Sequence, residues 1–182
     1  NAEGDVEAAK VAQEEAERLK ALPPALVSVL SFIHEGKLKK AEQVCRNFLQ
    51  NDKKHVEAMR LLADIGARLY VLDDAEFLLE SCVAFDPDNR RARVDYVNVL
   101  HRRQKFELAL DQARLLYDSD PLNPALETLY ANERAAVGEF AEALDLYDSV
   151  LTKVPDNAHV HMVKGHALKT VGRQEEAVES YQ

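Results

Sequence analysis

Apolar and polar residues repeat along this chain with a period of 34 positions. The segments 137–147, VGEFAEALDLY, and 171–181, VGRQEEAVESY, share five of eleven residues at that interval. Each segment is amphipathic, with the apolar spacing of a helix that buries one face. A small residue recurs at the same interval in mid-helix, where two helices that cross closely have no room for bulk. These small residues are Ala41, Ala75, Ala109, Ala143 and Ala177.

The prolines mark the boundaries of the repeat. Pro87, Pro121 and Pro155 recur at the same interval in the sequences DPDN, DPLN and VPDN. Proline fixes φ and has no N–H, so each step is predicted to end one helix and begin the next. A Leu or Phe stands three residues before the alanine in four copies, and a Gly five before it in three. These residues are Leu38, Leu72, Phe106 and Phe140, with Gly36, Gly138 and Gly172.

A repeat of this length made of helix, turn and helix resembles the tetratricopeptide repeat. The resemblance implies an all-α fold, a right-handed α-solenoid of stacked helical hairpins whose inner wall is lined by the first helix of each hairpin. The copies run 22–55, 56–89, 90–123, 124–157 and, in part, 158–182. Residues 1–21 are expected to hold a tag remnant and an acidic helix over 3–20, separated from the array by Pro23 and Pro24. The last copy stops inside its second helix without a polar cap, so the natural protein is expected to continue.

Composition narrows the possible partners. The net charge is −9, which disfavours nucleic acid and anionic membranes as partners because both need basic patches. No run of eighteen apolar residues occurs, so a cytoplasmic protein is expected. Cys45 and Cys82 are expected to be reduced, buried packing residues.

The residues that could suggest a catalytic or metal-binding site have simpler structural explanations. The sequence GHALKT at 165–170 ends like a phosphate loop but lacks its second glycine. Asp73 and Asp74 are expected at a helix start, where acidic residues are favourable. The remaining candidates are His159, His161 and His166, which are two and five residues apart. Histidines at these spacings do not share one helical face, so a metal site is not expected. We therefore expect no catalytic residue, no cofactor and no metal.

The remaining candidate site is the inner wall. The tetratricopeptide resemblance implies that six positions of each first helix line a groove, and it assigns five basic and three acidic side chains there. A wall of that charge in an acidic chain favours an acidic or mixed-charge peptide, although solvated side chains without a ligand would show the same pattern. The carboxylate clamp of chaperone adaptors is excluded, because the required Lys, Asn and Arg set is missing. The polar wall set is Glu57, Arg60, Asp64, Arg68, Arg91, Asp95, Asn98, His101, Arg102, Asn132, His159, His166 and Lys169.

The first copy differs from the others, because its groove positions are apolar: Leu26, Val27, Leu30 and Ile33. An exposed apolar strip usually marks a contact surface. Either the segment 3–20 packs on it or a partner does, and the tethered segment is favoured by its effective concentration.

The leading hypothesis is a non-catalytic scaffold that binds a protein or peptide in its concave groove. The alternative comes from residues 160–181, which resemble the last repeat of bacterial proteins where a tetratricopeptide array precedes a sulfotransferase domain. On that hypothesis the chain is a regulatory or substrate-presenting arm, and the catalytic residues lie beyond residue 182. Self-association through uncapped terminal repeats is a third possibility.

Overall fold

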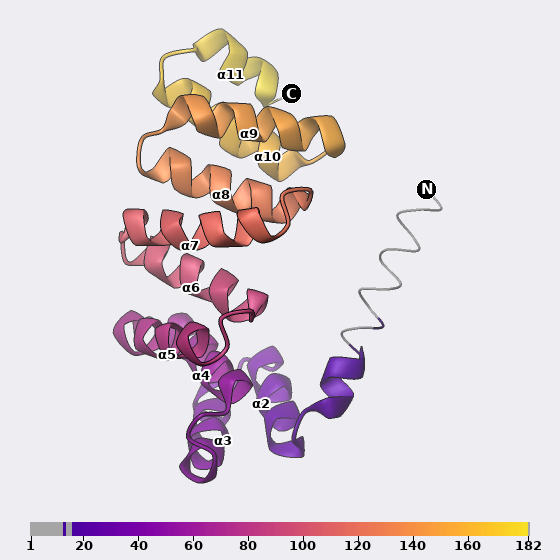
Figure 1. Cartoon of the computed structure of the whole chain (residues 1–182), viewed down its shortest axis with the longest axis vertical. Helices are drawn as coiled ribbons and strands as arrows, with labels where there is room; N and C mark the ends of the chain where they lie inside the picture. The colour runs from indigo at the N-terminus through magenta and orange to yellow at the C-terminus, as the bar shows by residue number, and fades with distance from the viewer. Residues whose placement is uncertain (1–12, 14–15, 182) are drawn as a thin grey trace. The chain divides into compact units, whose positions relative to one another are not determined.

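The computed structural model describes residues 13 and 16–181, and Figure 1 shows these as helices joined by short turns. No strand occurs in this part of the chain. Residues 16–21 are helical, whereas Ala8, Val11 and Ala12 of the predicted N-terminal helix lie outside the described residues. The named helices are α2 (Pro24–His34), α3 (Leu38–Asn51), α4 (Val56–Arg68), α5 (Leu72–Phe85), α6 (Arg90–Arg102), α7 (Phe106–Ser119), α8 (Pro124–Ala136), α9 (Phe140–Lys153), α10 (Ala158–Thr170) and α11 (Gln174–Ser180).

The asparagine of each proline-containing motif is a helix N-cap. The side-chain oxygens of Asn89, Asn123 and Asn157 accept hydrogen bonds from backbone N–H groups in the first turns of α6, α8 and α10, at 3.0, 3.0 and 3.2 Å. Such a bond satisfies a donor that the helix itself leaves unpaired. The motif therefore combines a proline that precedes the boundary with an asparagine that begins the next helix.

The turn inside each hairpin needs one residue in the left-handed region. Three copies place a glycine there; Gly138, for example, has φ +93°. In the other two copies the residues are Tyr70 and Gln104, with φ values of 61° and 59°. The backbone conformation is thus kept where the glycine is absent, at a cost of roughly 1 kcal/mol for a side chain in that region.

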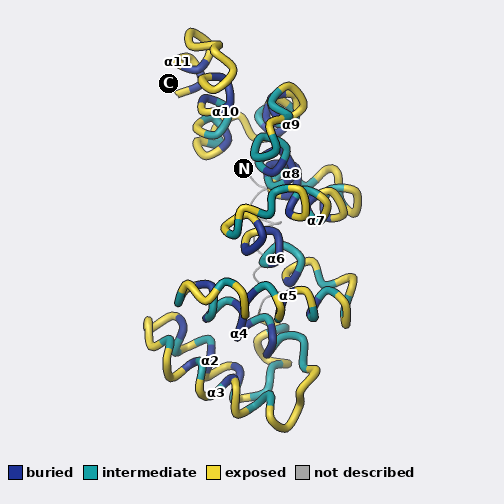
Figure 2. The backbone as a smooth tube through the Cα atoms, turned by 90° about the vertical axis from the view of Figure 1, so that its left-hand side faces the viewer, coloured by how far each residue is buried: buried dark blue, intermediate teal, exposed yellow. Residues whose placement is uncertain are grey.

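The chain divides into two compact units, one ending at Leu78 and the other beginning at Leu79, so that the boundary lies within α5. In unit 1, Leu26, Val29 and Ile33 of α2 pack with buried residues of α3 and α4. Figure 2 shows buried positions within the helices and exposed positions at many of the turns. None of the described helices combines the length and the apolar character that crossing a membrane requires.

In unit 2, the helices α8 to α11 share one apolar cluster. Buried residues of α9, such as Tyr147 and Val150, pack with Val160 and Leu168 of α10. A charged pair lies beside this core: Lys153 Nζ is 2.7 Å from Glu127 Oε2, and the Glu127 side chain is 2% exposed. The prediction of buried alanines at close crossings is confirmed in both units, with four fully buried and the fifth 3% exposed.

Candidate functional site

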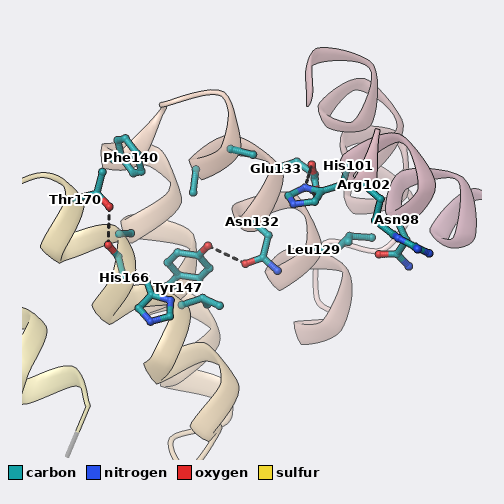
Figure 3. Close-up of a pocket in the computed structure, with 14 residues that line it drawn as sticks. Asn98, His101, Arg102, Leu129, Asn132, Glu133, Phe140, Tyr147, His166 and Thr170 are labelled. Atoms are coloured by element: carbon teal, nitrogen blue, oxygen red, sulfur yellow. Dashed lines mark hydrogen bonds and ion pairs between the residues drawn. The ribbon is translucent and has the colours of Figure 1, made fainter. Parts of the chain in front are cut away.

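A hollow of about 660 Å³ lies in unit 2, on the first helices of three consecutive hairpins. We call it the unit 2 hollow, and Figure 3 shows its lining. Most of the lining comes from α6, α8 and α10, and α9 contributes two aromatic side chains. The lining residues are Asn98, His101, Arg102, Leu129, Asn132, Glu133, Ala135, Ala136, Phe140, Tyr147, Val163, His166, Ala167 and Thr170.

Asn132 is oriented by a buried tyrosine. The hydroxyl of Tyr147, which is 1% exposed, donates a hydrogen bond of 2.8 Å to Asn132 Oδ1. Burial, together with the nearby charge of Glu133, raises the pKa of the Tyr147 hydroxyl, so it stays protonated and able to donate. Because this bond uses the amide oxygen, Asn132 presents its Nδ2 hydrogens as donors (Figure 3).

A second polar pair connects α6 and α8. His101 Nδ1 lies 2.9 and 3.1 Å from the two carboxylate oxygens of Glu133, which is 3% exposed. Burial raises the pKa of Glu133, and the hydrogen bond to His101 opposes this shift. The His101 ring also packs edge-on against Phe106 at 5.3 Å between centroids. The pair therefore fixes the imidazole at the edge of the hollow and satisfies the buried carboxylate.

Three side chains occupy equivalent positions along the hollow. Asn98, Asn132 and His166 are each one repeat period apart and come from α6, α8 and α10. Asn98 and His166 are exposed, and the His166 ring contacts Tyr181 edge-on at 5.7 Å. The same repeat position therefore contributes a polar group to this cavity in each of the three hairpins.

Five of the thirteen polar residues of the predicted wall set line this hollow: Asn98, His101, Arg102, Asn132 and His166. Four others are on α6 and α10 but outside the lining: Arg91, His159 and Lys169 are exposed, and Asp95 is half-buried. The last four, Glu57, Arg60, Asp64 and Arg68, are on α4 in unit 1.

The charged residues of α4 pair with one another. Arg60 contacts Glu57 at 2.8 Å, and Arg68 contacts Asp64 at 3.0 Å. Glu57 also contacts Arg18, from the helical segment 16–21, at 2.7 Å. Burial alone would raise the pKa of Glu57, but the two arginines hold it below its usual value.

The predicted apolar strip of the first copy needs correction. Leu26 and Ile33 are not exposed wall residues; they are 0% and 8% exposed and belong to the core of unit 1. Their spacing with Val29, three and then four residues along α2, puts them on the face that packs against α3 and α4. Of the four residues, Val27 is 43% exposed and Leu30 is half-buried at the edge of the core.

The sequence interpretation missed two buried polar groups that line the hollow, Glu133 and Tyr147. Glu133 lies on the buried side of α8, and an acidic residue among apolar neighbours was the available signal. Tyr147 is one of the residues shared by the segments 137–147 and 171–181, so packing of the repeat alone accounted for it. Cys45 and Cys82 are buried free thiols, as predicted. Among the described residues, no group of three His, Cys, Asp or Glu side chains is placed to hold a metal ion.

Comparison with known proteins supports the predicted fold. A family model described as tetratricopeptide repeat matches residues 130–182. MamA 41-end from Desulfovibrio magneticus RS-1 is similar in structure, with a TM-score of 0.78 and 13% identity over 88% of this chain and 93% of that chain. The structure MamA AMB-1 C2221 has a TM-score of 0.70 and 22% identity over 86% of this chain and 92% of that chain. The search of curated proteins gave no match.

At these identities the structural likeness establishes the fold and not the ligand. The predicted class, an all-α solenoid of stacked tetratricopeptide-like hairpins, is confirmed.

Proposed function

We propose that the chain is a non-catalytic scaffold module that binds a protein or peptide in the unit 2 hollow. The observation that carries this proposal is the set of equivalent polar residues, Asn98, Asn132 and His166, which face one cavity from three successive hairpins. Helices pack roughly 10 Å apart, and an extended chain advances about 3.3–3.6 Å per residue. Successive side chains of the set therefore match groups about three residues apart on an extended peptide.

The polar side chains suit a peptide backbone better than a reactive substrate. Asn132 offers N–H donors in an orientation that Tyr147 fixes before any ligand arrives, so little side-chain ordering remains for the binding step. An amide can donate to a backbone carbonyl without needing a charged partner. A groove of this kind contributes binding energy through pre-organisation.

The charge of the groove favours an acidic partner. Arg102 is exposed at the hollow, and Arg91 and Lys169 are exposed on the same first helices. These basic residues belong to a chain with a net charge of −9. A local contrast of this sign speeds the arrival of an acidic ligand and makes its binding depend on salt.

The test is binding of a fluorescent acidic peptide library to wild type and to the double variant Arg91→Gln/Arg102→Gln, each at low and high salt. Exposed ion pairs contribute about 0.2–1 kcal/mol each, so the double variant should weaken binding roughly 2- to 30-fold, with a smaller salt dependence. The matched control is Arg46→Gln/Arg114→Gln, which removes two exposed arginines from α3 and α7. Equal affinities for wild type and the groove variant, or an equal loss in the control, would contradict an acidic partner.

Three expectations from the sequence remain predictions: a sulfotransferase domain beyond residue 182, a cytoplasmic location, and self-association through the terminal repeats. The third is open to a direct experiment, because Val178 and Tyr181 are 56% and 46% exposed. Sedimentation over a hundredfold concentration range tests it.

A further inference from the structure

Exposure divides the lining of the unit 2 hollow into a polar edge and an apolar inner wall. The polar residues Asn98, Arg102 and His166 are exposed. The apolar residues are half-buried or buried, and they come from α8, α9 and α10. They are Leu129, Ala135, Ala136, Phe140, Val163 and Ala167. A ligand that reaches past the polar edge therefore meets mostly carbon.

The two polar groups buried behind this wall are already satisfied within the protein. Both carboxylate oxygens of Glu133 lie within hydrogen-bonding distance of His101 Nδ1, and the Tyr147 hydroxyl donates to Asn132. Glu133 is 3% exposed, so the wall offers little to a lysine or arginine side chain. A basic anchor would lose its hydration without gaining a partner there.

The hollow exists because one hairpin has small residues where its neighbours have long ones. Ala135 and Ala136 of α8 come one repeat period after His101 and Arg102. They also come one period before Lys169 and Thr170 of α10. Two methyl groups in place of an imidazole and a guanidinium leave open space in the middle of the row, with longer polar side chains on both sides.

We infer that the unit 2 hollow takes one large apolar side chain, leucine or phenylalanine, from an extended peptide that carries an acidic residue next to it. This inference rests on the proposed function and adds the identity of the anchor. The apolar wall would be covered by the anchor side chain. The basic residues at the edge, Arg102 above all, match the acidic neighbour by charge, and Asn132 would donate to the backbone between the two.

The probes are fluorescein-labelled peptides with the sequence Gly-Ser-Asp-Xaa-Asp-Ser-Gly, in which Xaa is Phe, Leu, Ala or Lys, measured by fluorescence anisotropy. We expect the Phe and Leu peptides to bind at least about tenfold more tightly than the Ala and Lys peptides, since burying a large apolar side chain contributes that much. Equal affinity for Phe and Ala would overturn the inference.

The variant Ala136→Leu should narrow the open space beside the apolar wall and abolish the preference for Phe over Ala. Its matched control is Ala125→Leu, a change of the same size at an exposed position of α8 outside the lining. Thr170→Phe narrows the same space from the exposed side of α10 and serves if Ala136→Leu disturbs folding. A preference that survives in both variants would show that the anchor binds elsewhere.

The outcomes separate the anchor from the proposed function. If all four peptides bind equally, and binding weakens in Arg91→Gln/Arg102→Gln, the groove function stands and the apolar anchor is wrong. If no peptide of either library binds, both are wrong.

Discussion

Substitution of Gly165 tests whether this glycine is needed for the packing of Tyr181 against α10. Gly165 lies in α10 and is buried. A Cβ atom added there would be 2.6 Å from Cζ and 2.9 Å from Cδ1 of Tyr181, well inside van der Waals contact. The Tyr181 ring must therefore leave its position in the variant Gly165→Ala.

The size of the effect follows from the covered part of the ring. Tyr181 is 46% exposed, so about half of its surface is covered. With roughly 150–250 Å² for a fully buried aromatic side chain, the covered part is about 100 Å², or ~2.5 kcal/mol at 25 cal/mol/Å². Replacing a glycine inside a helix by alanine gains about 1 kcal/mol. We therefore expect Gly165→Ala to lower the free energy of unfolding by up to about 1.5 kcal/mol.

Urea denaturation of a double-mutant cycle with Tyr181→Ala isolates this contact. In the Tyr181→Ala background, Gly165→Ala should stabilise the protein by about 1 kcal/mol, so the two sites should couple by up to ~2.5 kcal/mol. Gly66→Ala is the matched control, since a Cβ there meets its nearest neighbour, Val71 O, at 3.4 Å. If Gly165→Ala stabilises wild type as much as Gly66→Ala does, the packing explanation is wrong.

Three further predictions concern buried groups. Burial raises the pKa of Glu133 in the folded state, so the folded protein binds a proton at this carboxyl more tightly than the unfolded protein does. Urea denaturation should therefore show wild type gaining stability relative to Glu133→Gln as the pH falls from 7 to 5. The opposite trend would contradict the raised pKa. Lys153→Ala leaves the carboxylate of Glu127 buried without its cation, so we expect a loss of roughly 3 kcal/mol. Lys164→Ala should cost less than about 1 kcal/mol, because its partner carboxylate, Asp148, is exposed. Similar losses in the two variants would contradict a special cost of burying the Glu127 carboxylate. Cys45 and Cys82 are both 0% exposed, and burial raises the pKa of the Cys45 thiol to about 11. Ellman's reagent at pH 8 should therefore label the two cysteines only after unfolding, and rapid labelling of the folded protein would refute their burial.

The sequence predicted the fold because each hairpin meets the same packing problem. Alanines that recur once per repeat indicated close helix crossings, and Ala75 and Ala109, for example, are fully buried. The glycine pattern was incomplete, yet the turns at Tyr70 and Gln104 keep the left-handed conformation. Packing of the whole hairpin thus outweighs the local cost of one non-glycine residue.

The site was only partly predictable, because it depends on distances between helices of different hairpins. The tetratricopeptide register placed Asn98 and Asn132 on the wall, but it could not show that Tyr147 orients one of them. The pair His101–Glu133 joins residues 32 apart, which no local pattern connects. The register also failed for Leu26, because heptad-like spacing along α2 directs that side chain to the core.

Equivalent positions in the two units have different surroundings, which favours unit 2 as the binding region. Asp64 of α4 comes one repeat period before Asn98 and forms an ion pair with Arg68 on its own helix. Glu57 of the same helix already contacts two arginines, one of them Arg18 from the N-terminal segment. A peptide at α4 would have to compete with these contacts for charged groups that are already neutralised. At the unit 2 hollow the corresponding residue Asn132 is an uncharged amide, and its oriented donors can meet a peptide without breaking an ion pair.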